Sequence, residues 1–233
     1  MATEIIRLEE VAKNFTLHLR GGARIPVFEG LNMSLQAGEC VALTGASGAG
    51  KSTLMRLIYA NYRAGAGRIL IAHENDTVDL ASAPARLIMD VRARTLGYVS
   101  QFLRVIPRVP TLDVVAEPLV VLGTDREEAR ERAASLLKRL AIPDNLWDLP
   151  PATFSGGEQQ RVNVARGFVH PYPALLLDEP TASLDAANRA TVVSLIEEAK
   201  VRGAAIVGIF HDQAVRDQVA DRCFDVEAVR VAA

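Results

Sequence analysis

The fold of this chain is decided by residues 45–52, which read Gly-Ala-Ser-Gly-Ala-Gly-Lys-Ser from Gly45 to Ser52. The apolar run at residues 40–44 precedes this stretch and predicts a buried strand, and a helical pattern begins near Lys51. Glycines allow the connecting loop to curl so that successive backbone N–H groups face inward, and the helix adds its positive N-terminus. The stretch therefore predicts a strand–loop–helix unit that holds the phosphates of a nucleotide.

Two side chains in this loop predict which nucleotide it takes. The chain has lysine only at positions 13, 51, 138 and 200, and otherwise uses arginine as its basic residue. A compact ammonium at Lys51 suits the space between the β- and γ-phosphates, and the Ser52 hydroxyl is placed to ligate Mg²⁺. We therefore expect ATP and Mg²⁺ as cofactors. The residues predicted to bind the nucleotide in this loop are Gly45, Ser47, Gly48, Gly50, Lys51, Ser52 and Thr53.

A pair of acidic residues follows a second apolar run. Residues 174–177 predict a central parallel strand, and Asp178 and Glu179 come directly after it, at the end where α/β sheets bind their ligands. Neighbouring side chains on a strand point to opposite sides, so the two carboxylates are suited to different roles. Asp178 is predicted to hold Mg²⁺, directly or through water, and Glu179 to orient and polarise the attacking water.

A second candidate anion site lies much further along the chain. Residues 155–159 read Ser-Gly-Gly-Glu-Gln and precede a helical segment, so a hydroxyl, flexible glycines and a helix N-terminus come together. One ATP needs only one of the two elements to cradle it. Two copies arranged head to tail would each offer this element to the γ-phosphate bound by the other, and such a pair closes as a symmetric dimer. We therefore expect an ATP-dependent homodimer in which this element contacts the partner's nucleotide through Ser155, Gly156, Gly157 and Glu158.

Composition limits the class of protein. The 233 residues carry 26 basic and 28 acidic side chains, a net charge of −2, so no basic field predicts binding to nucleic acid or to an anionic membrane. The sequence has neither a signal-peptide pattern after Met1 nor an apolar stretch of the ~18 residues that a spanning helix needs. We expect a cytoplasmic protein, with Cys40 and Cys223 both reduced and buried, and any membrane role exercised through a partner.

Local patterns predict strands and helices that alternate on either side of a long helical stretch. Short strands and turns are expected in residues 4–36, a helix over 52–62 and a hairpin over 68–81. From about 103 to 170 the pattern is helical, and after 174 strands and helices alternate again.

These patterns predict an α/β fold with a helical insertion. We expect one domain over residues 1–233. Its nucleotide-binding core comprises residues 1–100 and 171–233 and includes a β subdomain, and the helical lobe is inserted at 101–170.

Taken in order, the motifs resemble those of the ABC-type ATPase family, and the resemblance covers essentially the whole chain. It implies the P-loop NTPase core of that family, with a small antiparallel β subdomain and an inserted helical lobe. Ser155 to Gln159 resembles the signature motif, with Glu158 in place of the commoner Gly-Gln arrangement. Gln101 resembles the glutamine that senses Mg²⁺ and links the core to the lobe, which implies both a catalytic and a metal-binding role.

Three further residues take an expected role from the same resemblance. Asp185 ends a Ser-Leu-Asp run that resembles the loop crossing the dimer interface, which implies a contact with bound nucleotide. His211, after an apolar run, resembles the switch histidine that contacts the γ-phosphate. Phe15 resembles the aromatic residue that stacks on adenine, and its position equally fits a half-buried strand residue. The implied catalytic residues are Glu179, His211 and Gln101, and the implied metal-binding residues are Ser52, Gln101 and Asp178.

A narrower resemblance comes from segments outside these motifs. Residues 59–62, 101–108, 166–168 and 203–212 resemble the ATP-binding L protein of the phosphonate carbon–phosphorus lyase system. This resemblance implies an accessory ATPase of a cytosolic complex, with the soluble subunits of that complex as partners. The complex joins a phosphonate to the ribose of ATP with loss of adenine, and the implied product is a ribose 1-phosphonate 5-triphosphate.

Two alternative functions stay open at this point. The chain could be the ATP-hydrolysing subunit of a membrane transporter, in which case the segment after Gln101 would receive a helix of the membrane partner. It could also be an ATP-driven clamp acting on DNA, which is disfavoured because the sequence lacks a coiled-coil insertion and zinc motifs. The surface formed by residues 102–110 should distinguish the soluble partner from the membrane partner.

Overall fold

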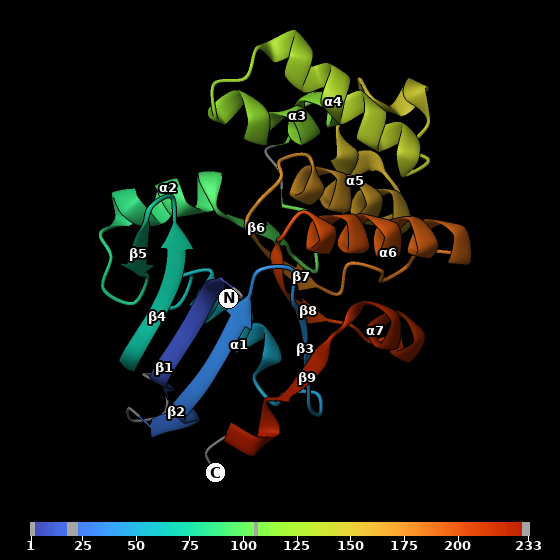
Figure 1. Ribbon diagram of the computed structural model, residues 1–233. Helices are drawn as coiled ribbons and strands as arrows, with labels where there is room; N and C mark the ends of the chain where they lie inside the picture. Colours follow the sequence, from blue (N-terminus) through green and yellow to red (C-terminus); the bar gives the residue numbers. More distant parts are fainter. Residues whose placement is uncertain (1–2, 18–22, 105–106, 230–233) are drawn as a thin grey trace.

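The computed structural model describes residues 3–17, 23–104 and 107–229, and it contains two sheets and a group of helices (Figure 1). The sheets lie beneath the helical lobe in the view of Figure 1, with the antiparallel sheet to one side of the parallel one. The α/β fold expected from the sequence, with a β subdomain and a helical lobe, is confirmed. The division at residues 101 and 170 stays a prediction.

The central sheet is parallel, and its strand order positions the site. Its strands, in spatial order, are β6 (Leu96–Val99), β7 (Ala174–Asp178), β8 (Ala205–Ile209), β3 (Cys40–Thr44) and β9 (Arg222–Asp225). Parallel strands all end at the same edge of a sheet. The loops that follow β7, β8 and β3 therefore meet at one edge, although they are far apart in the sequence.

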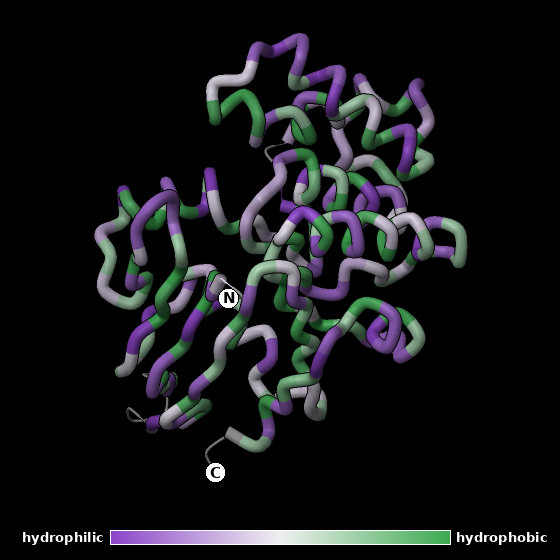
Figure 2. Tube along the Cα trace, in the orientation of Figure 1, coloured by the Kyte–Doolittle hydropathy of each residue, from purple (hydrophilic) through white to green (hydrophobic). Residues whose placement is uncertain are grey.

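Both faces of this sheet are buried, which explains the continuous apolar character of its strands. Alternate residues of β7 belong to different cores: Leu175 and Leu177 pack with the helical lobe, and Ala174 and Leu176 pack toward the antiparallel sheet. Figure 2 shows the corresponding hydrophobic segments concentrated in the interior of the molecule. The helices that flank the sheet are α1 (Lys51–Ile58), α6 (Ala186–Val201) and α7 (Gln213–Val219).

The second sheet is antiparallel and forms the β subdomain. Its strands, in spatial order, are β2 (Ala23–Gln36), β1 (Glu4–Leu17), β4 (Ala66–His73) and β5 (Asp76–Asp79). The expected hairpin over 68–81 corresponds to β4 and β5. In place of the short strands expected in 4–36, the structure has two 14-residue strands, because register shifts let the long pair bend without ending.

The lobe is built from three helices and two short 3₁₀ turns. These are α3 (Thr111–Val121), α4 (Arg126–Arg139), η2 (Asp144–Leu146), η3 (Pro151–Thr153) and α5 (Gly156–Phe168). Asp125 begins α4, where its side chain accepts hydrogen bonds from the backbone N–H groups of Glu127 and Glu128. This lobe rests on α6 and on the edge of the parallel sheet (Figure 1).

Two further expectations about local structure were wrong, and three elements were not predicted. The helix expected over 52–62 ends at Ile58, where Tyr59 forms its C-cap. The elements that no sequence pattern predicted are α2 (Ala85–Arg94), the strand β9 and the short 3₁₀ turn η4 (Glu227–Val229). Cys40 is buried as expected, but Cys223 is exposed because it lies on β9 at the edge of the sheet.

Candidate active site

The loop after β3 has the backbone that its glycines predict. Gly45, Gly48 and Gly50 all have positive φ, a region that other residues avoid. At Gly50, which precedes α1, an added Cβ would also lie 2.8 Å from Cζ of Phe28. The Lys51 ammonium donates to the carbonyl oxygens of Gly45 (2.6 Å) and Ala46 (2.9 Å). The loop therefore folds back over its own lysine, and its carbonyl groups hold the positive charge at the loop.

The carboxyl edge of the sheet joins this loop to the residues after β7 and β8. Asp178 pairs with Ile209 across these strands, and the Glu179 N–H donates to the Ile209 carbonyl at 3.0 Å. A cavity of about 230 Å³ forms where the three loops meet. It is lined by Ser47, Gly48, Gly50, Lys51, Ser52, Thr53, Glu179, Ile209 and His211.

Glu179 and His211 contact each other directly at this cavity. His211 Nε2 lies 2.7 Å from Glu179 Oε1, and the histidine side chain is 70% exposed. Glu179 has a φ of 56°, which is unusual for a residue other than glycine, and Gln160 Nε2 donates to its carbonyl at 3.2 Å. The Glu179 side chain lines the same cavity as the phosphate loop. An oriented carboxylate beside an imidazole can accept a proton from water and stabilise the charge that follows.

Asp178 is suited to holding a cation. Its side chain is 3% exposed, Oδ2 accepts a hydrogen bond from the Tyr98 hydroxyl at 3.2 Å, and Oδ1 has no partner among the described residues. Burial raises the pKa of Asp178, because a buried carboxylate loses its hydration. A divalent cation would satisfy the orphaned oxygen and favour the ionised form. The Asp178 carboxylate therefore fits Mg²⁺, and the assignment of the Ser52 hydroxyl as a second oxygen ligand stays a prediction.

Gln101 lies beside Asp178, away from the phosphate loop. It follows β6, is exposed, and lines a neighbouring cavity of about 540 Å³ together with Asp178, Tyr98 and Arg56. The structure thus places the two residues of the acidic pair in the lining of two different cavities at one sheet edge. Glu179 faces the phosphate loop, and Asp178 and Gln101 line the second cavity.

The remaining predicted residues do not line either of these two cavities. Ser155 begins α5, where its side chain and that of Glu158 are hydrogen-bonded to each other. Asp185 begins α6 and accepts from the N–H of Asn188 at 2.8 Å. Phe15 is half-buried on β1, and its ring packs edge-on against Tyr62 with centroids 5.4 Å apart. Within one described chain, Ser155 to Glu158 and Asp185 are thus separate from the phosphate loop.

Three residues that support the site were missed from the sequence. Tyr98 donates to Asp178, and Gln160 donates to the Glu179 carbonyl. Arg189 donates to Asp212 Oδ2 (2.7 Å) and to the Leu184 carbonyl (3.2 Å), so it joins the loop before α6 to the loop that follows His211. For Tyr98 and Gln160, the sequence offered one indication: a glutamine or tyrosine within an apolar segment needs a polar partner when it is buried.

The fold and the site together define a nucleoside triphosphatase with a phosphate loop, an acidic pair and a separate helical lobe. The family model described as "ABC transporter" matches residues 28–182. The chain is also 32% identical to the uncharacterised ABC transporter ATP-binding protein YvrO of Bacillus subtilis, covering 94% of this chain and 91% of that protein. It is 34% identical to LolD of Idiomarina loihiensis, the ATP-binding protein of a lipoprotein-releasing system, over 94% of this chain and 93% of LolD. The chain therefore belongs to the ABC transporter family, as an ATP-binding cassette.

Other similar proteins extend this result. The macrolide export ATP-binding/permease protein MacB of Brucella melitensis is 36% identical over 95% of this chain, which spans 33% of MacB. The cassette MJ0796, solved as a dimer in a post-hydrolysis state with ADP and phosphate, superimposes with a TM-score of 0.85 at 27% identity, covering 95% of this chain and 94% of MJ0796. The cassette fold is thus shown, and the chain binds ATP with Mg²⁺, as is usual for this family.

Proposed function

We propose that this chain is the ATP-hydrolysing cassette of a membrane transporter, acting at the cytoplasmic face on a permease carried by the same polypeptide or by another. The observation that carries this proposal is the similarity to MacB, LolD and YvrO, whose names describe macrolide export, a lipoprotein-releasing system and an ABC transporter. It supports the transporter alternative better than the phosphonate function that the sequence suggested. In the described ranges no helix is both long and apolar enough to cross a bilayer.

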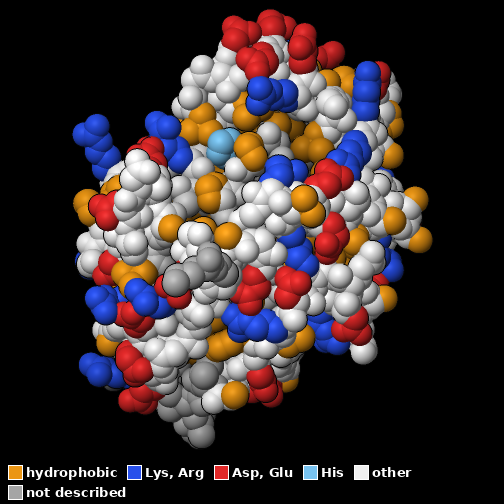
Figure 3. All heavy atoms as spheres, viewed as in Figure 1, with side chains coloured by type: hydrophobic (Ala, Val, Ile, Leu, Met, Phe, Trp, Pro, Cys, Tyr) orange, Lys and Arg blue, Asp and Glu red, His pale blue; other side chains and the backbone are white. Residues whose placement is uncertain are grey.

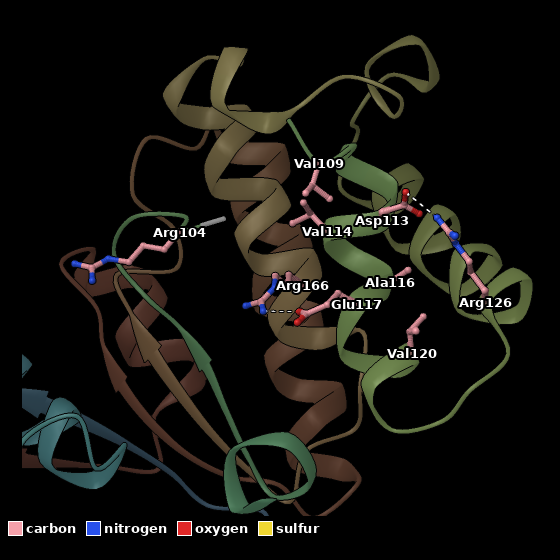
Figure 4. Close-up of a pocket in the computed structure, with 9 residues that line it drawn as sticks. All are labelled: Arg104, Val109, Asp113, Val114, Ala116, Glu117, Val120, Arg126 and Arg166. Carbon is pink, nitrogen blue, oxygen red and sulfur yellow. Dashed lines mark hydrogen bonds and ion pairs between the residues drawn. The ribbon is translucent and has the colours of Figure 1, made fainter. Parts of the chain in front are cut away.

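A partly apolar cleft in the helical lobe supports a docking role. The cleft has a volume of about 400 Å³, and Val109, Val114, Ala116 and Val120 contribute its apolar lining (Figure 4). Charged pairs flank it: Glu117 accepts from Arg166 at 2.6 Å, and Asp113 accepts from Arg126 at 3.3 Å. An apolar floor with a charged rim is suited to an amphipathic helix of a partner.

A second cleft continues this surface toward α2. It has a volume of about 220 Å³ and lies between α2 and the lobe, with Met89 and Val121 among its lining residues. These two side chains are 61% and 63% exposed. Figure 3 shows hydrophobic side chains gathered where the lobe meets the rest of the molecule in this view. Exposed apolar side chains at a cleft are typical of a protein contact surface.

We further propose that two copies of the cassette bind ATP between them, head to tail. Lys51 and the N–H groups of its loop would bind the phosphates, and Ser52 and Asp178 would hold Mg²⁺, which would neutralise charge on the phosphates. Glu179, supported by His211, orients the attacking water and accepts its proton. Ser155 of the second copy would complete the γ-phosphate site. The dimeric state of MJ0796 supports this arrangement.

A second candidate function is retained because of one specific observation. Tyr59, Asn61, Gln101, Phe102 and Arg166 come from the segments that resemble the phosphonate L protein, and all of them line the 540 Å³ cavity beside Asp178. Segments that are distant in the sequence thus share one surface. This convergence favours a specialised partner at that surface, and a soluble phosphonate-cleaving complex is the candidate that the resemblance implies. Val105 and Ile106, in the middle of the predicted partner surface 102–110, lie outside the described residues.

The two candidates can be separated by recovering the partner. The Glu179→Gln protein, which should retain ATP, is used as bait with MgATP in extracts prepared with and without detergent, and captured proteins are identified by mass spectrometry. A polytopic permease captured only in detergent would support the transporter cassette. Soluble subunits of a phosphonate-cleaving complex captured without detergent would overturn it in favour of the second candidate.

Matched surface variants make this experiment specific. Met89→Asp and Val121→Asp place a charge at the proposed docking surface and should abolish capture of the permease. Val201→Asp places the same charge at an exposed valine at the end of α6, outside both clefts, and should leave capture unchanged. Equal capture by all three variants would contradict docking at this surface.

A further inference from the structure

We propose that Glu158 restrains ATP-dependent dimerisation by holding the hydroxyl of Ser155, so that the signature element of each copy engages the other's nucleotide only after this contact opens. This inference rests on the head-to-tail homodimer proposed above. It gives Glu158 a positioning role in place of the direct nucleotide contact expected from the sequence.

The hydrogen bonds at the start of α5 carry the argument. The Ser155 hydroxyl donates to Glu158 Oε2 across 2.6 Å, and the Ser155 backbone N–H donates to the same oxygen across 2.9 Å. The Glu158 N–H donates in return to Ser155 Oγ at 3.3 Å. A serine hydroxyl has one proton to donate. Ser155 and Gly156 are exposed, so a phosphate from a second copy can approach, but it meets a hydroxyl whose proton is already committed.

The charge on Glu158 strengthens this restraint. Its hydrogen bonds with Ser155 lower the pKa of Glu158, so the carboxylate is ionised at neutral pH. A hydrogen bond to an ionised acceptor is roughly twice as strong as one between neutral groups. A phosphate oxygen must therefore compete with a carboxylate for the same proton, and two negative groups are brought close together. Both effects oppose closure of the dimer.

Helix capping alone does not account for a carboxylate at this position. The reciprocal arrangement of Ser155 and Glu158 is a capping box, and either Glu or Gln satisfies the backbone at its third helical position. Glutamine at position 158 would keep the cap while offering the hydroxyl a neutral and weaker acceptor. A purely structural cap predicts equal dimerisation with either residue, whereas a restraint predicts a difference.

The test compares dimer affinity in MgATP by analytical ultracentrifugation. Turnover is blocked by Glu179→Gln in every protein, and Glu158→Gln is added to one of them. We expect the double variant to dimerise about tenfold more tightly, since a charge-assisted bond is replaced by a neutral one. Glu131→Gln, on the exposed surface of α4, makes the same change in net charge and should have no effect. Thermal unfolding verifies that each variant is folded.

A second pair of variants tests whether the tighter dimerisation expected for Glu158→Gln depends on the Ser155 hydroxyl. In a Ser155→Ala background there is no hydroxyl proton to release, so Glu158→Gln should give a markedly smaller gain. The same gain in both backgrounds would mean that charge alone acts, and it would overturn the positioning role.

The remaining outcomes separate this inference from the proposed dimer. If the Glu179→Gln protein dimerises in MgATP and Glu158→Gln does not tighten it, the restraint is wrong and the dimer stands. If neither protein associates while both bind ATP, the head-to-tail dimer is wrong and the restraint is overturned with it.

Discussion

Tyr98 is a residue on which the predicted metal site depends, although it touches neither the phosphate loop nor Glu179. It donates to Asp178 Oδ2 and leaves Oδ1 for a cation. We expect Tyr98→Phe to raise the Mg²⁺ concentration for half-maximal ATPase activity about three- to tenfold, since a hydrogen bond to a charged group is lost. Tyr59→Phe, in the ring that packs against Tyr98, is the matched control and should leave Mg²⁺ dependence unchanged. An unaltered Mg²⁺ titration for Tyr98→Phe would show that this hydroxyl does not support the metal site.

Glu179 is the residue to which we assign the attacking water. Glu179→Gln retains size and removes the base, so hydrolysis should slow by ~10²–10⁴-fold. ATP binding should persist, because the phosphate contacts come from the loop after β3. Single-turnover hydrolysis and equilibrium ATP binding measure the two effects separately. Normal turnover in this variant would assign the base elsewhere.

The residues whose chemistry restricts their type could be predicted from the sequence. Lys51 stands out in a chain that prefers arginine, and Asp178 and Glu179 stand out after an apolar strand. Tyr98 and Gln160 could not be predicted, because their partners are brought to them only by strand order and by the packing of α5 on the sheet. Glu158 was expected at the nucleotide, and its contact with Ser155 follows from the cap geometry of α5.

At the scale of elements, Arg189 links the loop before α6 to the loop before α7. Its guanidinium holds both the Leu184 carbonyl and Asp212, which follows His211. Arg189→Lys keeps the charge but cannot donate to Asp212 and to the Leu184 carbonyl at the same time. We therefore expect the ATPase kcat to fall several-fold, with the KM for ATP unchanged. Arg202→Lys at the exposed C-cap of α6 is the control. A rise in KM alone would place Arg189 in nucleotide binding.

Arg139 on α4 and Glu198 on α6 join the lobe to the core. The hydrogen bond from Arg139 lowers the pKa of Glu198 to about 2. A carboxyl group whose pKa is lower in the folded than in the unfolded chain stabilises the fold at pH values above its pKa in the unfolded chain. This contribution is lost as the pH falls toward 2. The pair is largely exposed, so Arg139→Gln should lower Tm by only about 1–3 °C at pH 7. The difference in Tm between the unmodified protein and Arg139→Gln should shrink as the pH falls from 4.5 to 3. A difference that stayed constant over this range would contradict the low pKa assigned to Glu198.

The elements that could be predicted are those with a strong apolar pattern. The strands β3, β7 and β8 are continuous apolar runs because both faces of their sheet are covered. In α2, Val91 is the one fully buried residue, and Leu87 and Ile88 pack only partly against the core, so the apolar stripe is too short to stand out in the sequence. The strand β9 lies at the sheet edge and is mostly exposed, which removes the signal in the same way.

At the scale of the whole molecule, we propose that two surfaces are completed by other copies or partners. One is the pair of clefts between α2 and the lobe, proposed to dock a permease. The other is the start of α5, which lines neither the cavity at the phosphate loop nor the cavity beside Asp178. The central claim is that one cassette's phosphate loop and another's signature element together form each ATP site.

The most direct test of this claim mixes two inactive variants. Lys51→Ala removes the phosphate-binding ammonium, and Ser155→Arg blocks closure on the partner's nucleotide. In a mixed pair, the loop of the Ser155→Arg protein faces the intact signature element of the Lys51→Ala protein, so one complete site is restored. We predict MgATP hydrolysis by the mixture well above the sum of the separate variants. Activity equal to that sum, from folded proteins, would contradict a site shared between two copies.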